Sequence, residues 1–257
     1  MDWERTMLQV EHLSCVYGDT PIVRDMTFRV EKGERLCILG PNGCGKTTLL
    51  RGIMGILPAQ GTVTVDGETL TGMPARCKAR KIALMSQLSS AYFAYTVYET
   101  VMLGRYAHQK RSTFLSESEE DRRIVRESLE KTGMFPYQDR LIIELSGGQL
   151  QRVFLAQIFA QDPQVILLDE PTNHLDLKYQ VELVDTLKDW VKAGDRCAVG
   201  VLHDINLALS FADRILLMED GMEKAFEKTS TFDLSLLSQT YQTDVQGYMR
   251  EALKRWQ

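Results

Sequence analysis

The chain has 257 residues, of which 44% are hydrophobic and 25% charged, and its formal net charge is -5. That length allows one large core or two small ones, no apolar run approaches a membrane span, and the negative charge disfavours nucleic-acid binding. Five scattered cysteines without a C-x-x-C pair indicate reduced thiols, and the acidic start lacks an apolar signal core. We therefore expect a soluble, cytoplasmic globular protein.

Short β-rich runs are followed by a helical stretch and then by further β-rich runs. The predicted strands are residues 28–30, 36–39, 62–65, 82–85, 165–168, 197–202 and 214–218. Between residues 87 and 163 the periodicity is helical, and Ser116 with Glu119 predicts a capping box there. Apolar residues recur every three or four positions over residues 177–190, and an amphipathic helix is expected over 248–256. The pattern predicts a doubly wound α/β core with a helical insertion.

A complete phosphate loop follows the predicted strand at residues 36–39. It reads Gly40-Pro41-Asn42-Gly43-Cys44-Gly45-Lys46-Thr47 and continues into Thr48 and an apolar helix. The glycines let consecutive backbone N–H groups converge on phosphates, Lys46 adds a cation, and the Thr47 hydroxyl suits magnesium. These residues predict an ATP site, with Cys44 expected either as a reactive thiolate beside a helix N-terminus or as a packed, inert thiol.

Two carboxylates follow the apolar strand at residues 165–168. The buried strand presents Asp169 at its carboxyl end, which suits the magnesium shell. Glu170 points elsewhere and is placed to polarise a water for attack on the γ-phosphate. The alternative is an exposed pair of loop charges. The neighbouring phosphate loop favours ATP hydrolysis with Glu170 as general base.

The pentapeptide Leu145-Ser146-Gly147-Gly148-Gln149 begins a helix with two glycines, so that Ser146 and the helix N-terminus form a second anion-binding surface. Together with the phosphate loop, residues 165–170, the Leu175-Asp176 pair and His203, it resembles the nucleotide-binding subunit of ABC transporters, over residues 8–221. The resemblance implies a P-loop NTPase α/β fold with a mixed, mainly parallel sheet flanked by helices, a small β subdomain and an inserted helical subdomain. One ABC ATPase domain over 1–257 is expected, with its nucleotide-binding core at 1–87 and 162–222, the insertion at 88–161 and a tail at 223–257.

The resemblance also implies roles at matching positions. Tyr17 corresponds to the aromatic that stacks on adenine, Gln87 to the glutamine that senses magnesium and water, and His203 to the histidine that holds the γ-phosphate. Asp176 matches an aspartate at the dimer interface. The plainer alternatives are a half-buried core tyrosine, a solvated loop amide and a helix N-terminal histidine. In the family two copies meet head to tail, and each ATP lies between one phosphate loop and the partner's residues 145–149.

Residues 96–108, which run from Thr96-Val97 to Gly104-Arg105 and His108, resemble a segment of importers for iron siderophores, haem and cobalamin. This implies an iron-transport ATPase at the cytoplasmic face of the membrane, bound to integral membrane permease subunits and served indirectly by an extracytoplasmic substrate-binding protein. The alternatives are a soluble ABC ATPase of iron–sulfur cluster assembly and an importer for molybdate or another substrate. No residue of this chain names the substrate.

Overall fold

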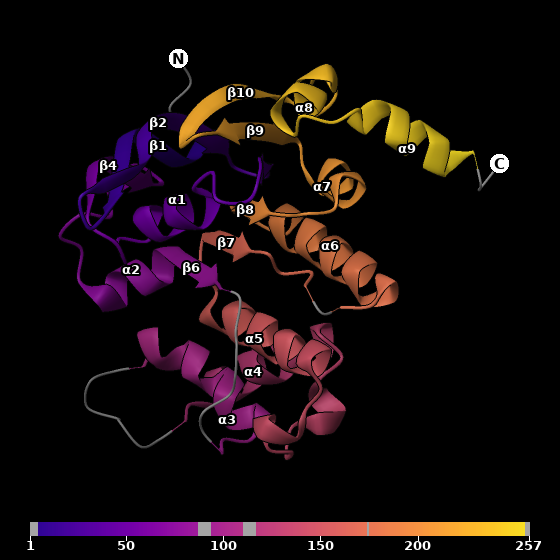
Figure 1. Ribbon diagram of the computed structural model, residues 1–257. Coiled ribbons are helices and arrows are strands. Elements are labelled where there is room, and N and C mark those ends of the chain that lie inside the picture. Colours follow the sequence, from indigo (N-terminus) through magenta and orange to yellow (C-terminus); the bar gives the residue numbers. More distant parts are fainter. Residues whose placement is uncertain (1–4, 87–93, 110–116, 174, 255–257) are drawn as a thin grey trace.

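Two β-sheets form the framework of the chain, which the computed structural model describes over residues 5–86, 94–109, 117–173 and 175–254 (Figure 1). The strands are β1 (Thr6–Tyr17), β2 (Thr20–Glu31), β3 (Arg35–Leu39), β4 (Ala59–Val65), β5 (Glu68–Thr69), β6 (Ile82–Met85), β7 (Val165–Asp169), β8 (Cys197–Val201), β9 (Arg214–Glu219) and β10 (Met222–Lys228). The larger sheet has the order β10-β9-β3-β8-β7-β6, and the smaller sheet has the order β2-β1-β4-β5. Only the β9–β10 pair of the larger sheet is antiparallel, whereas the smaller sheet is antiparallel throughout.

The centre of the larger sheet determines where a site forms. Every residue of β7 and β8 is buried, which explains why both read as unbroken apolar runs rather than as alternating patterns. Strand β8 lies between β3 and β7. Because parallel strands present their carboxyl ends at one edge, the loops after β3, β7 and β8 are neighbours there.

Helices separate the sheets and cover the outer face of the larger one. They are α1 (Lys46–Ile53), α2 (Ala75–Lys81), α3 (Val97–Met102), α4 (Glu119–Lys131), α5 (Gly147–Gln161), α6 (Leu177–Lys192), α7 (Ile205–Phe211), α8 (Ser235–Thr240) and α9 (Val245–Leu253), with short 3-10 helices η2 (Leu103–Ala107), η3 (Phe135–Tyr137) and η4 (Ile142–Glu144). Leu50 of α1 packs between the sheets with Leu36 of β3, while Cys37 of β3 faces the opposite core with Leu187 of α6 and Phe211 of α7. None of the helices in the described ranges is long and apolar enough to cross a bilayer.

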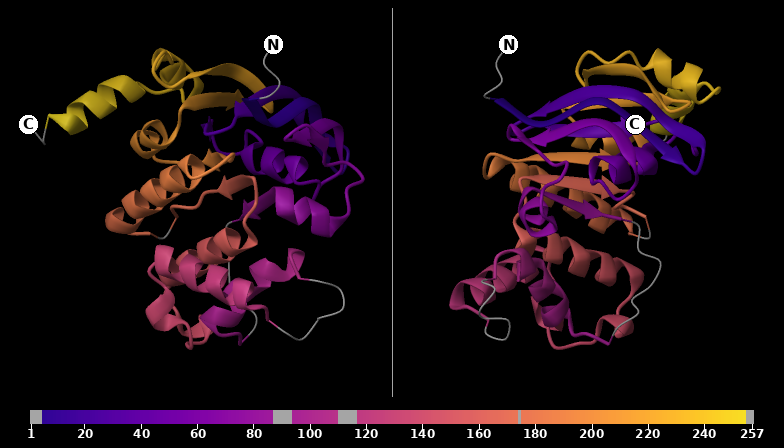
Figure 2. Two further views of the ribbon diagram at one scale, coloured as in Figure 1. Left: turned by 180° about the vertical axis from the view of Figure 1, so that it is seen from behind. Right: turned by 90° about the vertical axis from the view of Figure 1, so that its left-hand side faces the viewer.

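The helices α3, α4 and α5 form a lobe of their own below the larger sheet (Figure 1). Its core contains Val97 and Val101 of α3, Val125 and Leu129 of α4, and Val153 of α5. The two views of Figure 2 show the same lobe on one side of the sheet and the antiparallel sheet on the other. The predicted fold class is thereby confirmed, including the small β subdomain and the inserted helical subdomain.

Three local predictions need correction. The strands predicted at 28–30 and 62–65 belong to the smaller sheet, and the strands β1, β5 and β10 were not predicted. Helix α4 begins one residue after Ser118, whose hydroxyl accepts from the Asp121 N–H, so the N-cap is Ser118; Ser116 of the predicted capping box with Glu119 lies outside the described residues. The last helix begins at Val245 and ends at Leu253, earlier than the predicted 248–256.

Candidate active site

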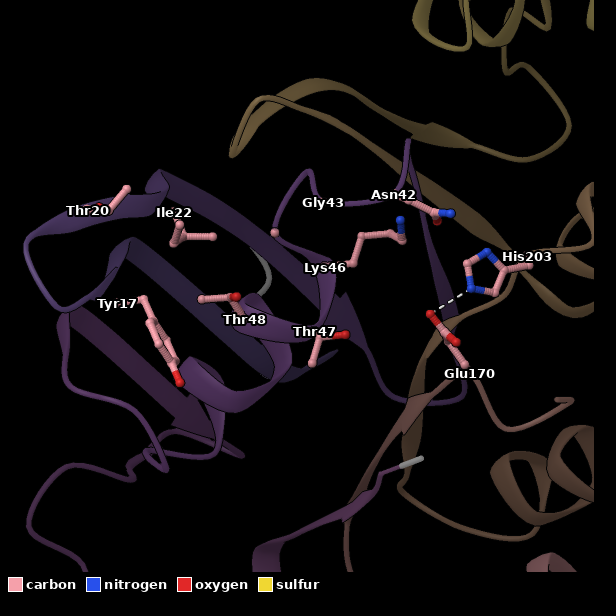
Figure 3. A pocket seen from close by; sticks show the side chains of 11 residues that line it. Tyr17, Thr20, Ile22, Asn42, Gly43, Lys46, Thr47, Thr48, Glu170 and His203 are labelled. Carbon is pink, nitrogen blue, oxygen red and sulfur yellow. Dashed lines mark ion pairs between the residues drawn. The ribbon is translucent and has the colours of Figure 1, made fainter. Parts of the chain in front are cut away.

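A cavity of about 680 Å³ opens at the carboxyl edge of the larger sheet, where the loops after β3, β7 and β8 meet. Tyr17, Thr20 and Ile22 from the β1–β2 hairpin line one end of it, and Glu170 and His203 line the other. The loop after β3 lies between these ends, as Figure 3 shows. The sheet order therefore brings together residues from three separate parts of the sequence.

The phosphate loop takes a conformation that needs its glycines. The φ angles of Gly40, Gly43 and Gly45 are 151°, 82° and 103°. A Cβ atom on Gly40 would lie 2.3 Å from the Met218 carbonyl oxygen of β9, which no side chain tolerates. Gly45 is the N-cap of α1, and no side chain caps that helix. Its first backbone N–H groups therefore have no side-chain acceptor, which is the arrangement that binds a phosphate.

Lys46 is buried against its own loop, with only 7% of its surface exposed. Its Nζ donates to the Gly40 carbonyl at 2.7 Å and to the Pro41 carbonyl at 2.8 Å. Its third contact is with Cys44 Sγ at 4.0 Å, and because a thiol sulfur is a weak acceptor, a phosphate oxygen can replace it. The loop thus positions a cation at its own entrance.

Thr47 and Asp169 form an oxygen pair beside this cation. The Thr47 hydroxyl donates to Asp169 Oδ1 at 2.9 Å, and Asp169 is only 5% exposed. Burial raises the pKa of Asp169, the hydrogen bond from Thr47 opposes that rise, and the neighbouring Glu170 charge adds to it. A hydroxyl and a carboxylate side by side are ligands that magnesium accepts, so the donor set fits this ion. Gln87, the third predicted ligand, lies outside the described residues.

Glu170 is held by contacts on both sides of its carboxylate. Its backbone is left-handed, with φ at 55°, and its N–H donates to the Val201 carbonyl of β8 at 3.1 Å. His203 Nε2 lies 2.6 Å from Glu170 Oε1, as Figure 3 shows, and Asn173 Nδ2 donates to Oε2 at 2.6 Å. A non-glycine residue in this conformation marks a locally constrained site. Asn173 was not predicted, although its place three residues after Glu170 suits such a contact.

The second anion-binding motif begins helix α5 and lies apart from the cavity. Ser146 is the N-cap of α5, and it forms a capping box in which its hydroxyl accepts from the Gln149 N–H and the Gln149 side chain accepts from the Ser146 N–H. Asp176 is exposed and caps α6 through the Tyr179 N–H. Neither residues 145–149 nor Asp176 belong to the described residues that line the cavity of this chain.

Tyr17 and Cys44, two further predicted site residues, differ in their exposure to solvent. Tyr17 is 68% exposed at the hairpin end of the cavity, so it is not a core aromatic. Cys44 is only 7% exposed, and burial raises the pKa of its thiol more strongly than Lys46 lowers it. Of the two expectations for Cys44, its burial and raised pKa favour the packed thiol.

Comparison with known proteins places this site in a family. The family model described as ABC transporter matches residues 23–173. The chain is 39% identical over 247 residues to the uncharacterized ABC transporter ATP-binding protein YvrA of Bacillus subtilis, covering 95% of this chain and 56% of that protein. It is 39% identical to the petrobactin import ATP-binding protein FpuD of Bacillus anthracis (83% of this chain, 78% of that one) and 37% identical to the iron(3+)-hydroxamate import ATP-binding protein FhuC of Bacillus subtilis (93% and 89%).

Solved structures agree with this relationship. A putative metal-chelate type ABC transporter in an inward-facing conformation matches with a TM-score of 0.78 and 30% identity, over 93% of this chain and 89% of that one. The dimeric bacterial ABC transporter cassette MJ0796 matches with a TM-score of 0.78 and 27% identity, over 88% and 100%. The predicted family is confirmed: this chain belongs to the ABC transporter family, as one of its ATP-binding proteins.

Proposed function

We propose that this chain is the ATP-hydrolysing motor subunit of an ABC importer for an iron chelate, haem or cobalamin. The observation that carries the hydrolytic part is the convergence of the phosphate loop, the Thr47–Asp169 pair and the Glu170–His203 pair on one cavity. The importer part is supported by relatives of similar length that are named as import ATP-binding proteins for petrobactin and iron hydroxamate.

The chemistry is ATP hydrolysis by in-line attack of water on the γ-phosphate. Backbone N–H groups at the start of α1, residues 45–48, and the Lys46 side chain bind the phosphates, and Tyr17 stacks on the adenine from the far end of the cavity. Glu170 accepts the proton of the attacking water, and His203, 2.6 Å from its carboxylate, binds the γ-phosphate. Thr47, Asp169 and Gln87 would hold Mg²⁺, which would neutralise charge on the phosphates.

The active unit is a head-to-tail dimer. Residues 145–149 do not line the cavity within one chain. A second copy supplies Leu145, Ser146, Gly147, Gly148, Gln149 and Asp176 to each ATP. The dimeric form of the related cassette MJ0796 supports this arrangement.

The segment 96–108 supports a permease partner because its motif residues build a surface. Gly104 packs so closely on α5 that a Cβ atom would lie 2.3 Å from the Gln157 carbonyl. Arg105 and His108 donate to the Ala160 and Gln161 carbonyls at the end of α5. Leu103, which precedes Gly104, remains 51% exposed. We infer that this surface receives integral membrane permease subunits at the cytoplasmic face, with an extracytoplasmic substrate-binding protein acting on the permease.

The hydrolytic role is tested by Glu170→Gln. The amide keeps the shape of the side chain but cannot accept a proton, so we expect turnover to fall about a hundredfold or more while ATP stays bound. Size-exclusion chromatography with ATP and magnesium then shows a persistent dimer. Glu182→Gln on the exposed face of α6 is the matched control. Near-normal turnover of Glu170→Gln would remove Glu170 from the general-base role.

The transport role is tested in cells that lack the gene, complemented with wild type or with Glu170→Gln. We expect uptake of labelled ferric chelate or cobalamin to return only with the wild-type chain. A loss of iron–sulfur enzyme activity without any uptake defect would favour the assembly ATPase. A defect confined to molybdate uptake would support an importer role in which molybdate is the substrate.

A further inference from the structure

The C-terminal segment reaches back to the first residue of the phosphate loop. Tyr241 follows α8 directly, and its hydroxyl accepts a hydrogen bond from the Gly40 N–H at 3.1 Å, between residues 201 positions apart. Nothing in the sequence after residue 221 indicates such a role. In the ribbon, α8 lies beside β9 and β10 (Figure 1).

Tyr241 is fixed from its own side. Its N–H donates to the Leu237 carbonyl at 2.8 Å, and Leu237 is 1% exposed in the core on the outer face of the larger sheet. Burial raises the pKa of Tyr241. The phenol therefore stays neutral through the physiological range.

Gly40 is the residue whose geometry this contact controls. It is buried, its φ is 151°, and its carbonyl accepts from Lys46 Nζ at 2.7 Å. Tyr241 thus orients the peptide group before Gly40, and Lys46 orients the one after it. A loop that is already in its binding conformation loses less entropy when it takes up phosphate.

The same segment also contacts the other side of the site. Asn206 Nδ2 of α7 lies 3.5 Å from Met249 Sδ of α9, and α7 begins two residues after His203. Residues 235–253 therefore touch both the phosphate loop and the helix that follows the histidine. Tyr241 makes the direct contact with a nucleotide-binding group.

We propose that Tyr241 is a positioning residue that holds the phosphate loop in its nucleotide-binding conformation. The inference rests on the proposed binding of ATP by this loop. It adds a specific task for the C-terminal segment, through one hydroxyl group. Removing that hydroxyl weakens nucleotide binding and leaves the chemical step at saturating ATP unchanged.

Tyr241→Phe tests this, because it removes only the hydroxyl. The dissociation constant for MgADP, which the chain does not hydrolyse, is measured by calorimetric titration. We expect Tyr241→Phe to bind about three- to tenfold more weakly, with KM for ATP raised by a similar factor and kcat within about twofold of wild type. Tyr248→Phe, at a tyrosine 71% exposed on α9, should bind like wild type.

Four outcomes overturn the proposal or its basis. A dissociation constant of Tyr241→Phe equal to that of wild type sinks the positioning role, even if the thermal midpoint without nucleotide falls. A lower kcat with an unchanged KM would mean that Tyr241 acts on the chemical step and not on nucleotide binding. Lys46→Ala separates the positioning role of Tyr241 from the proposed ATP binding by the loop. Wild-type affinity for MgADP in that variant would exclude the phosphate loop as the nucleotide-binding site. If Tyr241→Phe does not fold, hydrogen exchange of the wild-type Gly40 amide decides, since rapid exchange contradicts a held N–H.

Discussion

Asp169 and Glu170 are adjacent carboxylates in different surroundings, and the backbone separates them. Asp169 is the last residue of a buried strand and is bound by Thr47, whereas Glu170 turns into the left-handed region and points across the cavity to His203. Successive side chains of a strand already point in opposite directions. The sequence therefore predicted two different directions, but the Asn173 contact that fixes Glu170 depends on the folded loop.

Thiol reactivity is predicted to follow exposure rather than the helix N-terminus. Cys77 is exposed, whereas Cys15, Cys37, Cys44 and Cys197 are buried, and burial raises the pKa of Cys37 to about 12. Since the thiolate is the nucleophile, N-ethylmaleimide should modify Cys77 first, as followed by mass spectrometry over time. Cys77→Ser should remove the fast phase without loss of ATPase activity. First labelling at Cys44, with protection by ATP, would contradict this.

At the scale of elements, buried strands were predicted well and irregular ones poorly. β7 and β8 are continuous apolar runs, so they can be recognised without knowing which residues face which side of the sheet. β1 was missed because its alternation breaks where the register with β2 shifts between Val10 and Leu13, and His12 there has a φ of 52°. A bulge inserts one residue, which moves every later side chain to the other face.

The start of α4 shows why a cap is difficult to place from sequence. Ser116 and Ser118 are each followed three residues later by an acid, Glu119 and Asp121, so both match the same pattern. The structure uses Ser118 because its partner Asp121 also pairs with Arg105 of η2. A tertiary contact, absent from any local window, decides between two equal local signals.

The Arg105–Asp121 pair is predicted to stabilise the helical lobe. The two side chains are 6% and 9% exposed, with Arg105 Nε 2.8 Å from Asp121 Oδ1. Arg105→Met leaves a buried carboxylate without its main partner, so we expect the free energy of unfolding to fall by about 3–5 kcal/mol in urea titration at pH 7. Arg123→Met, which removes exposed ion pairs of the same helix, should change it little.

The same pair predicts a pH dependence. Burial alone would raise the pKa of Asp121, but the hydrogen bonds from Arg105 and Ser118 hold it below its usual range. A depressed pKa contributes stability above the unfolded value, about 4, that is lost as pH falls through the folded value. The difference between wild type and Arg105→Met should therefore shrink below about pH 4. If the difference in free energy of unfolding between wild type and Arg105→Met stays constant with pH, the stability comes from packing. An equal loss in Arg123→Met would also contradict a specific role of the buried pair.

At the scale of the whole molecule, the proposed dimer divides each ATP site between two copies of the chain. The phosphate loop and residues 145–149 each lead into a helix, but of the two only the phosphate loop lines the cavity. Family membership and the dimeric cassette MJ0796 support a site in which the phosphate loop of one copy faces residues 145–149 of the other. The sequence predicted each half from its motif, whereas the capping box that orients Ser146 required the structure.

Mixing two inactive variants tests the composite site. Ser146→Asp keeps a side-chain acceptor at the N-cap of α5 but sets a carboxylate against the γ-phosphate, and Lys46→Ala removes the loop cation. A mixed dimer has one intact site, formed by the Lys46 loop of one copy and the Ser146 of the other. Equal mixtures should regain about a quarter of wild-type ATPase activity, because half the dimers are mixed and carry one site of two. If folded mixtures stay inactive at every protein concentration, each ATP is not shared between copies.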